Sequence, residues 1–200
     1  MARKHAEVDL KKELLKALRN ILKKEGIRGL DVRKIAKEAG CSIGTFYNHY
    51  KSLDDLVVYF NGETLDILTI SMFDRIAPSD SAKEIINKIC QNYIAFAKDN
   101  HTEWLLLLEH PLKIEIPAWY HNKSEQLFQK VSEMFHPILR GDKKDVEKAV
   151  KVLWSSLHGI CSLTLKQRLR SKKGQPDPLE LSQNLFHNYI LGYRIGVGIT

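Results

Sequence analysis

The sequence predicts an all-α protein. Along most of its 200 residues, apolar side chains recur at intervals of three and four, the spacing that places them on one face of a helix. Alternating runs of β-branched residues, which would indicate strands, do not occur. Proline- and glycine-rich breaks at residues 77–80 and 174–178 separate the helical stretches. We expect about nine helices, arranged as a small N-terminal three-helix bundle and a larger C-terminal helical bundle.

The N-terminal bundle begins with a helix over about residues 8–24, followed by two short helices within residues 31–50. Asp31 can cap the first of these short helices, and Gly40 supplies the residue without a Cβ that a left-handed helix end favours. Ser42 can cap the second. This spacing is that of a helix-turn-helix, whose second helix is short enough to enter a DNA major groove.

A fourth helix is expected after residues 52–55, where S-L-D-D resembles a capping box. We place the domain boundary near residue 70, between an N-terminal domain (1–70) and a C-terminal domain (71–200). The helices expected in the second domain cover residues 81–99, 102–109, 118–139, 143–170 and 179–197.

The charge is distributed unevenly along the chain. Residues 1–51 hold 13 Lys and Arg against 6 Asp and Glu, so they carry the whole net charge of +7. Residues 52–200 hold 18 of each sign and are neutral. A polyanion is the partner that relieves such a local excess, because each neutralised phosphate releases counterions. Charge and helix-turn-helix together indicate binding to double-stranded DNA.

A specific motif lies in this region. Residues 40–49 match the run G-x-S-x-G-T-F-Y-x-H, with V-R-K-I-A before them at residues 32–36. These residues, with Tyr50 and Leu56, resemble the TetR family of one-component transcriptional regulators over about residues 8–68. Members of that family often carry Lys at the position of Leu53, whereas the basic residue here is Lys51.

Residue chemistry gives each expected DNA contact a role. Asn48 is the best base reader, because its amide can pair with adenine, and Arg33 can fork onto a guanine or a phosphate. Ile43 and Thr45 suit apolar contact with a thymine methyl group, and Gly44 lets the backbone approach closely. Tyr47, His49 and Lys51 are expected to hold phosphates. The expected DNA contacts are Arg33, Ser42, Ile43, Gly44, Thr45, Tyr47, Asn48, His49 and Lys51. Phe46 and Tyr50 are expected to be buried instead, packing the recognition helix onto its neighbours.

Other classes of function find no support in the sequence. No two histidines have the spacing that places two imidazoles on one helix face, so we expect no metal and no cofactor. No catalytic motif is present, which argues against an enzyme. Three scattered cysteines, no signal-peptide pattern and no long apolar run predict a cytoplasmic protein without a membrane segment.

The C-terminal domain contains one further pattern, W-x-x-x-H-G at residues 154–159, which resembles one subgroup of the family's C-terminal domains. Spacing of four places Trp154 and His158 on one side of a helix. Two interpretations remain open: a packed structural cluster, or part of an aromatic ligand pocket with few polar groups. The residues expected in such a pocket are Tyr93, Phe96, Trp104, Trp119, Tyr120, Phe128, Trp154 and His158.

The function expected from these features is that of a homodimeric repressor, released from a palindromic operator by a small molecule. Dimerisation is expected through helices at about residues 143–170 and 179–197, which are apolar beyond one face. The resemblance implies the same pairing. The alternative is a DNA-bound adaptor whose helical domain binds another protein.

Overall fold

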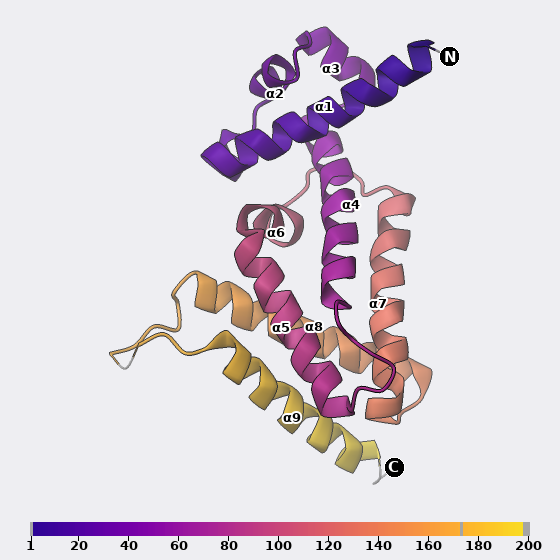
Figure 1. Ribbon diagram of the computed structural model, residues 1–200, viewed down its shortest axis with the longest axis vertical. Coiled ribbons are helices and arrows are strands. Elements are labelled where there is room, and N and C mark those ends of the chain that lie inside the picture. The colour runs from indigo at the N-terminus through magenta and orange to yellow at the C-terminus, as the bar shows by residue number, and fades with distance from the viewer. Residues whose placement is uncertain (1, 173, 198–200) are drawn as a thin grey trace. The chain divides into compact units, whose positions relative to one another are not determined.

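The computed structural model describes residues 2–172 and 174–197 (Figure 1). In this part of the chain the secondary structure consists of nine α-helices, a short 3-10 turn at Ile27–Gly29 and one isolated β-bridge, which confirms the all-α prediction. The helices are α1 (Ala2–Glu25), α2 (Val32–Glu38), α3 (Ile43–His49), α4 (Leu53–Met72), α5 (Ala82–Asp99), α6 (His101–Leu108), α7 (Ala118–Leu139), α8 (Lys143–Leu165) and α9 (Pro178–Val197).

The chain packs into two compact units. The first comprises Met1–Asp66 and Asn100–Tyr120, and the second comprises Ile67–Asp99 and His121–Thr200. Helix α4 therefore contributes residues to both units. Residues 100–120, which the sequence alone assigns to the domain after residue 71, pack with the N-terminal helices.

A continuous apolar core holds the first unit together. It combines residues of α1, α2, α3 and the first part of α4 with Leu106 of α6, which is fully buried. The amide of Asn61 on α4 donates a hydrogen bond of 3.3 Å to the Leu106 carbonyl, and Lys23 on α1 pairs with Glu103 on α6 at 3.8 Å. These contacts attach α6 to the helices that carry the helix-turn-helix.

In the second unit, α5, α8 and α9 pack against one another. Pro137 lies near the end of α7, where helical carbonyls no longer have amide partners. Arg194 of α9 supplies those donors: its Nε and Nη2 atoms lie 2.9 and 2.6 Å from the carbonyl oxygen of Ile138. This side chain fastens the end of α7 to α9.

Helix α8 ends at Leu165, so the prediction that it continues to residue 170 was wrong. Gln167 has a φ of 55°, and the amides of Gln167 and Arg168 donate to the carbonyls of Thr164 and Leu163 at 2.9 and 2.8 Å. This is a Schellman ending. This ending could not be predicted from the residues alone, because glycine is the usual residue in this left-handed position and glutamine occupies it here.

Candidate nucleic-acid interface

The helix-turn-helix begins at Asp31, as the sequence predicts. The Asp31 carboxylate accepts hydrogen bonds from the backbone amides of Arg33 and Lys34 at 2.9 and 3.2 Å. These are amides that the first turn of a helix leaves without a partner. The cap therefore fixes where α2 starts, and Arg33 lies exposed in its first turn.

The turn between α2 and α3 is a Schellman motif centred on Gly40. Gly40 has a φ of 70°, its amide donates to the Lys37 carbonyl at 3.1 Å, and the Cys41 amide donates to the Ala36 carbonyl at 2.9 Å. Cys41 packs against the core of the first unit, and burial raises the pKa of its thiol. A raised pKa disfavours the reactive thiolate, so Cys41 acts here as a small packing residue.

Ser42 caps α3 at its N-terminus. Its Oγ accepts a hydrogen bond from the Thr45 amide at 3.0 Å and lies 2.8 Å from the Thr45 hydroxyl oxygen. The two hydroxyls are therefore hydrogen-bonded to each other. The methyl group is the part of the Thr45 side chain that this hydrogen bond leaves free for an apolar contact. Between them, Gly44 is exposed, and an added Cβ would meet only the Ser42 hydroxyl, at 3.7 Å.

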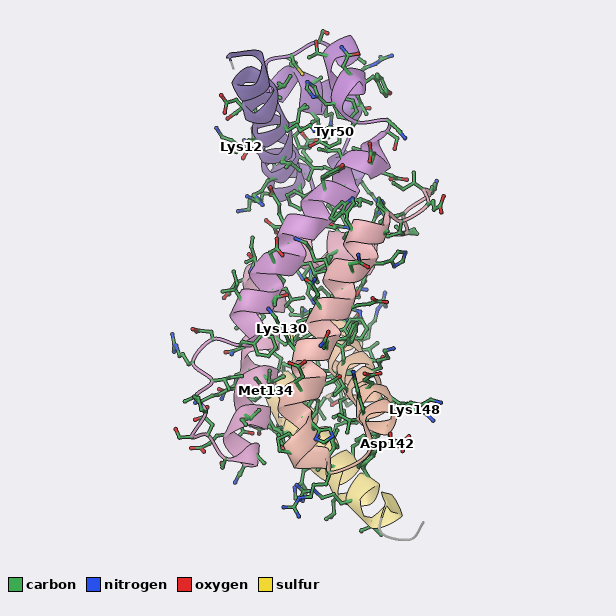
Figure 2. The ribbon with its side chains drawn as sticks, turned by 90° about the vertical axis from the view of Figure 1, so that its right-hand side faces the viewer. Lys12, Tyr50, Lys130, Met134, Asp142 and Lys148 are labelled. Carbon is green, nitrogen blue, oxygen red and sulfur yellow. The ribbon has the colours of Figure 1, made fainter. Side chains whose placement is uncertain are left out.

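Two aromatic side chains hold α3 in place. Phe46 and Tyr50 are buried, as expected, with exposed fractions of 0% and 2%. Tyr50, labelled in Figure 2, contacts the rings of Phe46 and of Tyr59 on α4 at centroid distances of 6.0 and 5.4 Å. Burial raises the pKa of its hydroxyl. The opposite side of α3 is left for solvent or a partner.

That opposite side carries much of the predicted DNA-contact set. Ile43 and Tyr47, one helical turn apart, are 41% and 54% exposed, and Asn48 is also exposed. His49 is half-buried, and its Nδ1 atom has no hydrogen-bond partner among the described residues. His49 therefore offers less exposed surface than Tyr47 and Asn48, and its contact with DNA stays a prediction.

Lys51 follows α3 and is exposed. Its backbone amide donates to the Asp55 carboxylate at 2.8 Å, while the Ser52 hydroxyl accepts from the Asp55 amide at 3.1 Å. The Ser52 hydroxyl thus provides one half of the predicted capping box at the start of α4, whereas Asp55 accepts from Lys51, the residue before the cap, and not from Ser52 itself. The Lys51 backbone is thus fixed by the cap, and its side chain is exposed.

Lys37 is a further candidate for a DNA contact that was not among the residues predicted from the sequence. It lies four residues after Arg33 on α2, both are exposed, and neither forms an ion pair within the described part of the chain. The four-residue spacing, which puts them on one helix face, was the available signal. Lys34 differs: its ammonium lies 2.6 Å from the Glu25 carboxylate, and that hydrogen bond raises the pKa of Lys34.

The aromatic residues proposed as a ligand pocket divide between the two units. Within the second unit, the Tyr93 hydroxyl lies 3.0 Å from Nδ1 of His158, and the His158 ring stacks on Trp154 at 5.7 Å. Phe128 meets Trp154 edge-on at 5.4 Å. Phe96, also in this unit, is buried, as is Tyr93, whereas Trp154 and His158 are half-buried. We call Tyr93, Phe128, Trp154 and His158 the aromatic cluster.

The other three candidates belong to the first unit. Trp104 is fully buried and stacks with His101 at 6.2 Å. Trp119 contacts Tyr59 on α4 at 5.1 Å and Tyr120 at 5.7 Å, and burial raises the pKa of Tyr120. These contacts give the three residues packing roles within the first unit.

Among residues 2–172 and 174–197, no group of three or more His, Cys, Asp and Glu side chains is arranged to hold a metal ion. None of the helices described there has the length and apolar character needed to cross a membrane.

Comparison with known proteins places the chain in a family. Residues 14–60 match the N-terminal domain of bacterial regulatory proteins of the tetR family, and residues 86–186 match the tetracyclin repressor-like C-terminal domain. A HTH-type transcriptional regulator of Staphylococcus aureus (strain MRSA252) is 31% identical over 85 residues, which cover 42% of this chain and 45% of the relative. The chain thus spans about half the length of the curated relatives it matches.

Solved structures share the fold at low sequence identity. A TetR-family transcriptional regulator from Streptomyces coelicolor superposes with a TM-score of 0.65 at 15% identity, over 90% of this chain and 97% of the other. The multidrug binding protein EbrR, complexed with ethidium, gives 0.62 at 18% identity, over 90% and 98%. The family matches to residues 14–60 and 86–186 of this chain show that it belongs to the TetR family of transcriptional regulators.

Proposed function

We propose that this regulator represses transcription by binding a palindromic operator as a homodimer, from which a small-molecule ligand releases it. The observation that carries the DNA-binding part is the two-sided character of α3. Phe46 and Tyr50 bury one side, while Ile43, Tyr47 and Asn48 are exposed. An exposed helix face with apolar, hydroxyl and amide groups, held by a rigid turn, suits insertion into a major groove.

The roles of Asn48 and Lys51 can be separated by mutation. Asn48→Ala should relax discrimination at one or two base pairs by about 1–3 kcal/mol each, because a base-edge contact is lost. Lys51→Ala should weaken binding to all sequences alike, since a phosphate contact carries no sequence information. The measurement is an anisotropy titration of the operator and its single-base variants at one salt concentration.

Lys130→Ala is the control for that experiment, because Lys130 is an exposed lysine on α7 (Figure 2) and lies outside the basic segment. It should leave both affinity and discrimination unchanged. Uniform loss of affinity in both test variants would show that the division into base reader and phosphate anchor is mistaken.

The ligand part of the proposal rests on the aromatic cluster. Trp154 and His158 remain half-buried, so part of each side chain is exposed beside the other aromatic residues of the cluster. Apolar walls with few polar groups are the composition of small-molecule sites. EbrR, which has the same fold, was solved with ethidium, a planar aromatic cation. An indole face attracts such a cation. Ethidium is therefore the first probe, followed by other lipophilic cations.

Binding at the aromatic cluster should stabilise the protein. At a ligand concentration a hundred times the Kd, the gain is about 2.7 kcal/mol, or several degrees in Tm. Trp154→Ala should abolish this shift, whereas Trp119→Ala, in the first unit, should keep it. Tyr93→Phe removes only the hydroxyl that lies beside His158, so it tests this polar contact of the cluster with little change in packing. No shift with any compound in the wild-type protein would favour the adaptor that binds another protein.

The dimer is proposed to form through α8 and α9. Each presents large apolar side chains to solvent: Val152 and Leu163 on α8 are 40% and 44% exposed, and Leu191 and Ile195 on α9 are 52% and 58% exposed. An added Cβ at Gly192 would meet nothing within 4 Å, so a second helix can approach closely there. Exposed apolar area of this kind marks association surfaces.

Sedimentation tests the dimer. The wild-type protein at micromolar concentration should have about twice the chain mass of 23.0 kDa. Leu191→Glu should lower that mass, because a carboxylate would be desolvated in an apolar interface. Ile70→Glu is the matched control, since Ile70 is 74% exposed but lies on α4. A wild-type monomer that still binds a palindrome tightly would overturn the proposal.

A further inference from the structure

The connection between α8 and α9 carries a second concentration of positive charge. Residues 166–174 are K-Q-R-L-R-S-K-K-G, with five basic residues and no acidic one. Residues 52–200 are neutral in total, so this charge is a local excess within that region. Neither the helix-turn-helix nor the aromatic cluster makes use of it.

The described part of this connection is folded. Gln167 closes the end of α8 in the left-handed conformation, and the backbones of Ser171 and Gly174 exchange two hydrogen bonds of 3.0 Å. The Gln175 side chain then donates to the Thr164 carbonyl at 3.2 Å, which ties the returning chain to α8. The connection projects beyond the helices of the second unit (Figure 1). The basic groups of its described residues are therefore held on an ordered turn.

A hollow of about 430 Å³ lies beside this turn, within the size range of small-molecule sites. Lys98 from the end of α5 and Arg170 from the turn contribute its two charged side chains. Thr164 and Gln175 add polar groups, and Pro178 at the start of α9 adds an apolar wall. The site thus draws on three helices and the turn that connects two of them.

Within the described residues, Lys98, Arg168 and Lys172 form no ion pair, and the guanidinium of Arg170 bonds to the Gln167 side chain at 3.2 Å. The end of α8 attracts cations, but that effect is confined to the last turn. Lys166, Arg168, Arg170 and Lys172 follow one another at intervals of two residues, and like charges this close together repel one another. A multivalent anion relieves that repulsion.

We propose that this hollow binds the phosphate groups of a small phosphorylated molecule, with Arg170 and Lys98 as the charged contacts. A guanidinium matches two phosphate oxygens at once, and the ammonium adds a second charge from the facing helix. One carboxylate would neutralise a single cation, whereas a di- or triphosphate neutralises several. The phosphate source is either a free nucleotide or polyphosphate, or an anionic phospholipid headgroup. This site is independent of the ligand proposed for the aromatic cluster.

Calorimetric titration of the full-length protein with inorganic triphosphate, at about 0.15 M salt, tests the site. The double variant Lys98→Gln/Arg170→Gln should weaken binding at least tenfold; both residues are exposed, so the fold should persist, as a melting curve verifies. Arg170→Lys keeps the charge but loses the paired donors, so it should weaken binding less.

Two controls separate this site from other basic surfaces. Lys148→Gln removes an exposed charge elsewhere on α8 (Figure 2), and Arg33→Gln/Lys37→Gln removes two from the helix-turn-helix. Both should keep wild-type affinity for triphosphate. Titration with ATP, and co-sedimentation with phosphatidylglycerol vesicles, distinguish the two phosphate sources; either kind of binding supports the site if the Lys98/Arg170 double variant loses it.

Three results would overturn the proposal. The first is wild-type protein that binds neither triphosphate, ATP nor the vesicles. The second is equal binding by the wild type and the Lys98/Arg170 double variant. The third is a Lys98/Arg170 double variant whose operator affinity falls while its triphosphate affinity is unchanged, which would make the turn a DNA-backbone contact instead.

Discussion

The reversal of the backbone at Gly40 sets the direction in which α3 leaves α2, and the exposed face of α3 depends on that direction. Gly40 adopts a φ of 70°, which places the Cys41 amide on the Ala36 carbonyl and brings Ser42 to the start of the next helix. Ser42 then caps α3, and Phe46 enters the core of the first unit. With one side of α3 fixed in this way, Tyr47 and Asn48 can only face outward.

The structure also refines the electrostatic argument. The +7 charge of residues 1–51 overstates what is available to DNA, because several of these cations have carboxylate partners within the first unit. Lys34 pairs with Glu25, Arg19 with Glu63 at 3.4 Å, and Lys23 with Glu103. Arg33, Lys37 and Lys51 form no such pair among the described residues. Within residues 31–51, these three, rather than the total charge, are the cations available for phosphates.

The features that the sequence predicted correctly are those set by local interactions. The caps at Asp31 and Ser42 and the turn at Gly40 each join residues no more than five apart, so a motif is enough to identify them. The stacking of Trp154 on His158 follows likewise from their spacing on α8. The end of α8 was missed because Gln167 takes a conformation in which glycine is usual.

Features that depend on distant residues could not be predicted in this way. The burial of Leu106 with α1 and α4 brings α6, and with it Trp104, into the first unit, whereas the aromatic cluster belongs to the second. The contact between Tyr93 and His158 joins residues 65 apart in the chain. Helical periodicity shows which face of a helix is apolar, but it does not show which other helix covers that face.

The most direct test of the account is the salt dependence of DNA binding by the full-length protein. Affinity for a palindromic duplex, measured between about 50 and 200 mM salt, should fall linearly on logarithmic axes with a slope of several units, since each phosphate contact contributes about 0.9. Arg33→Gln/Lys37→Gln should reduce the slope by up to about 2, whereas Lys148→Gln should not change it. A flat dependence in the wild-type protein would contradict the central claim that the first unit binds DNA through its phosphates.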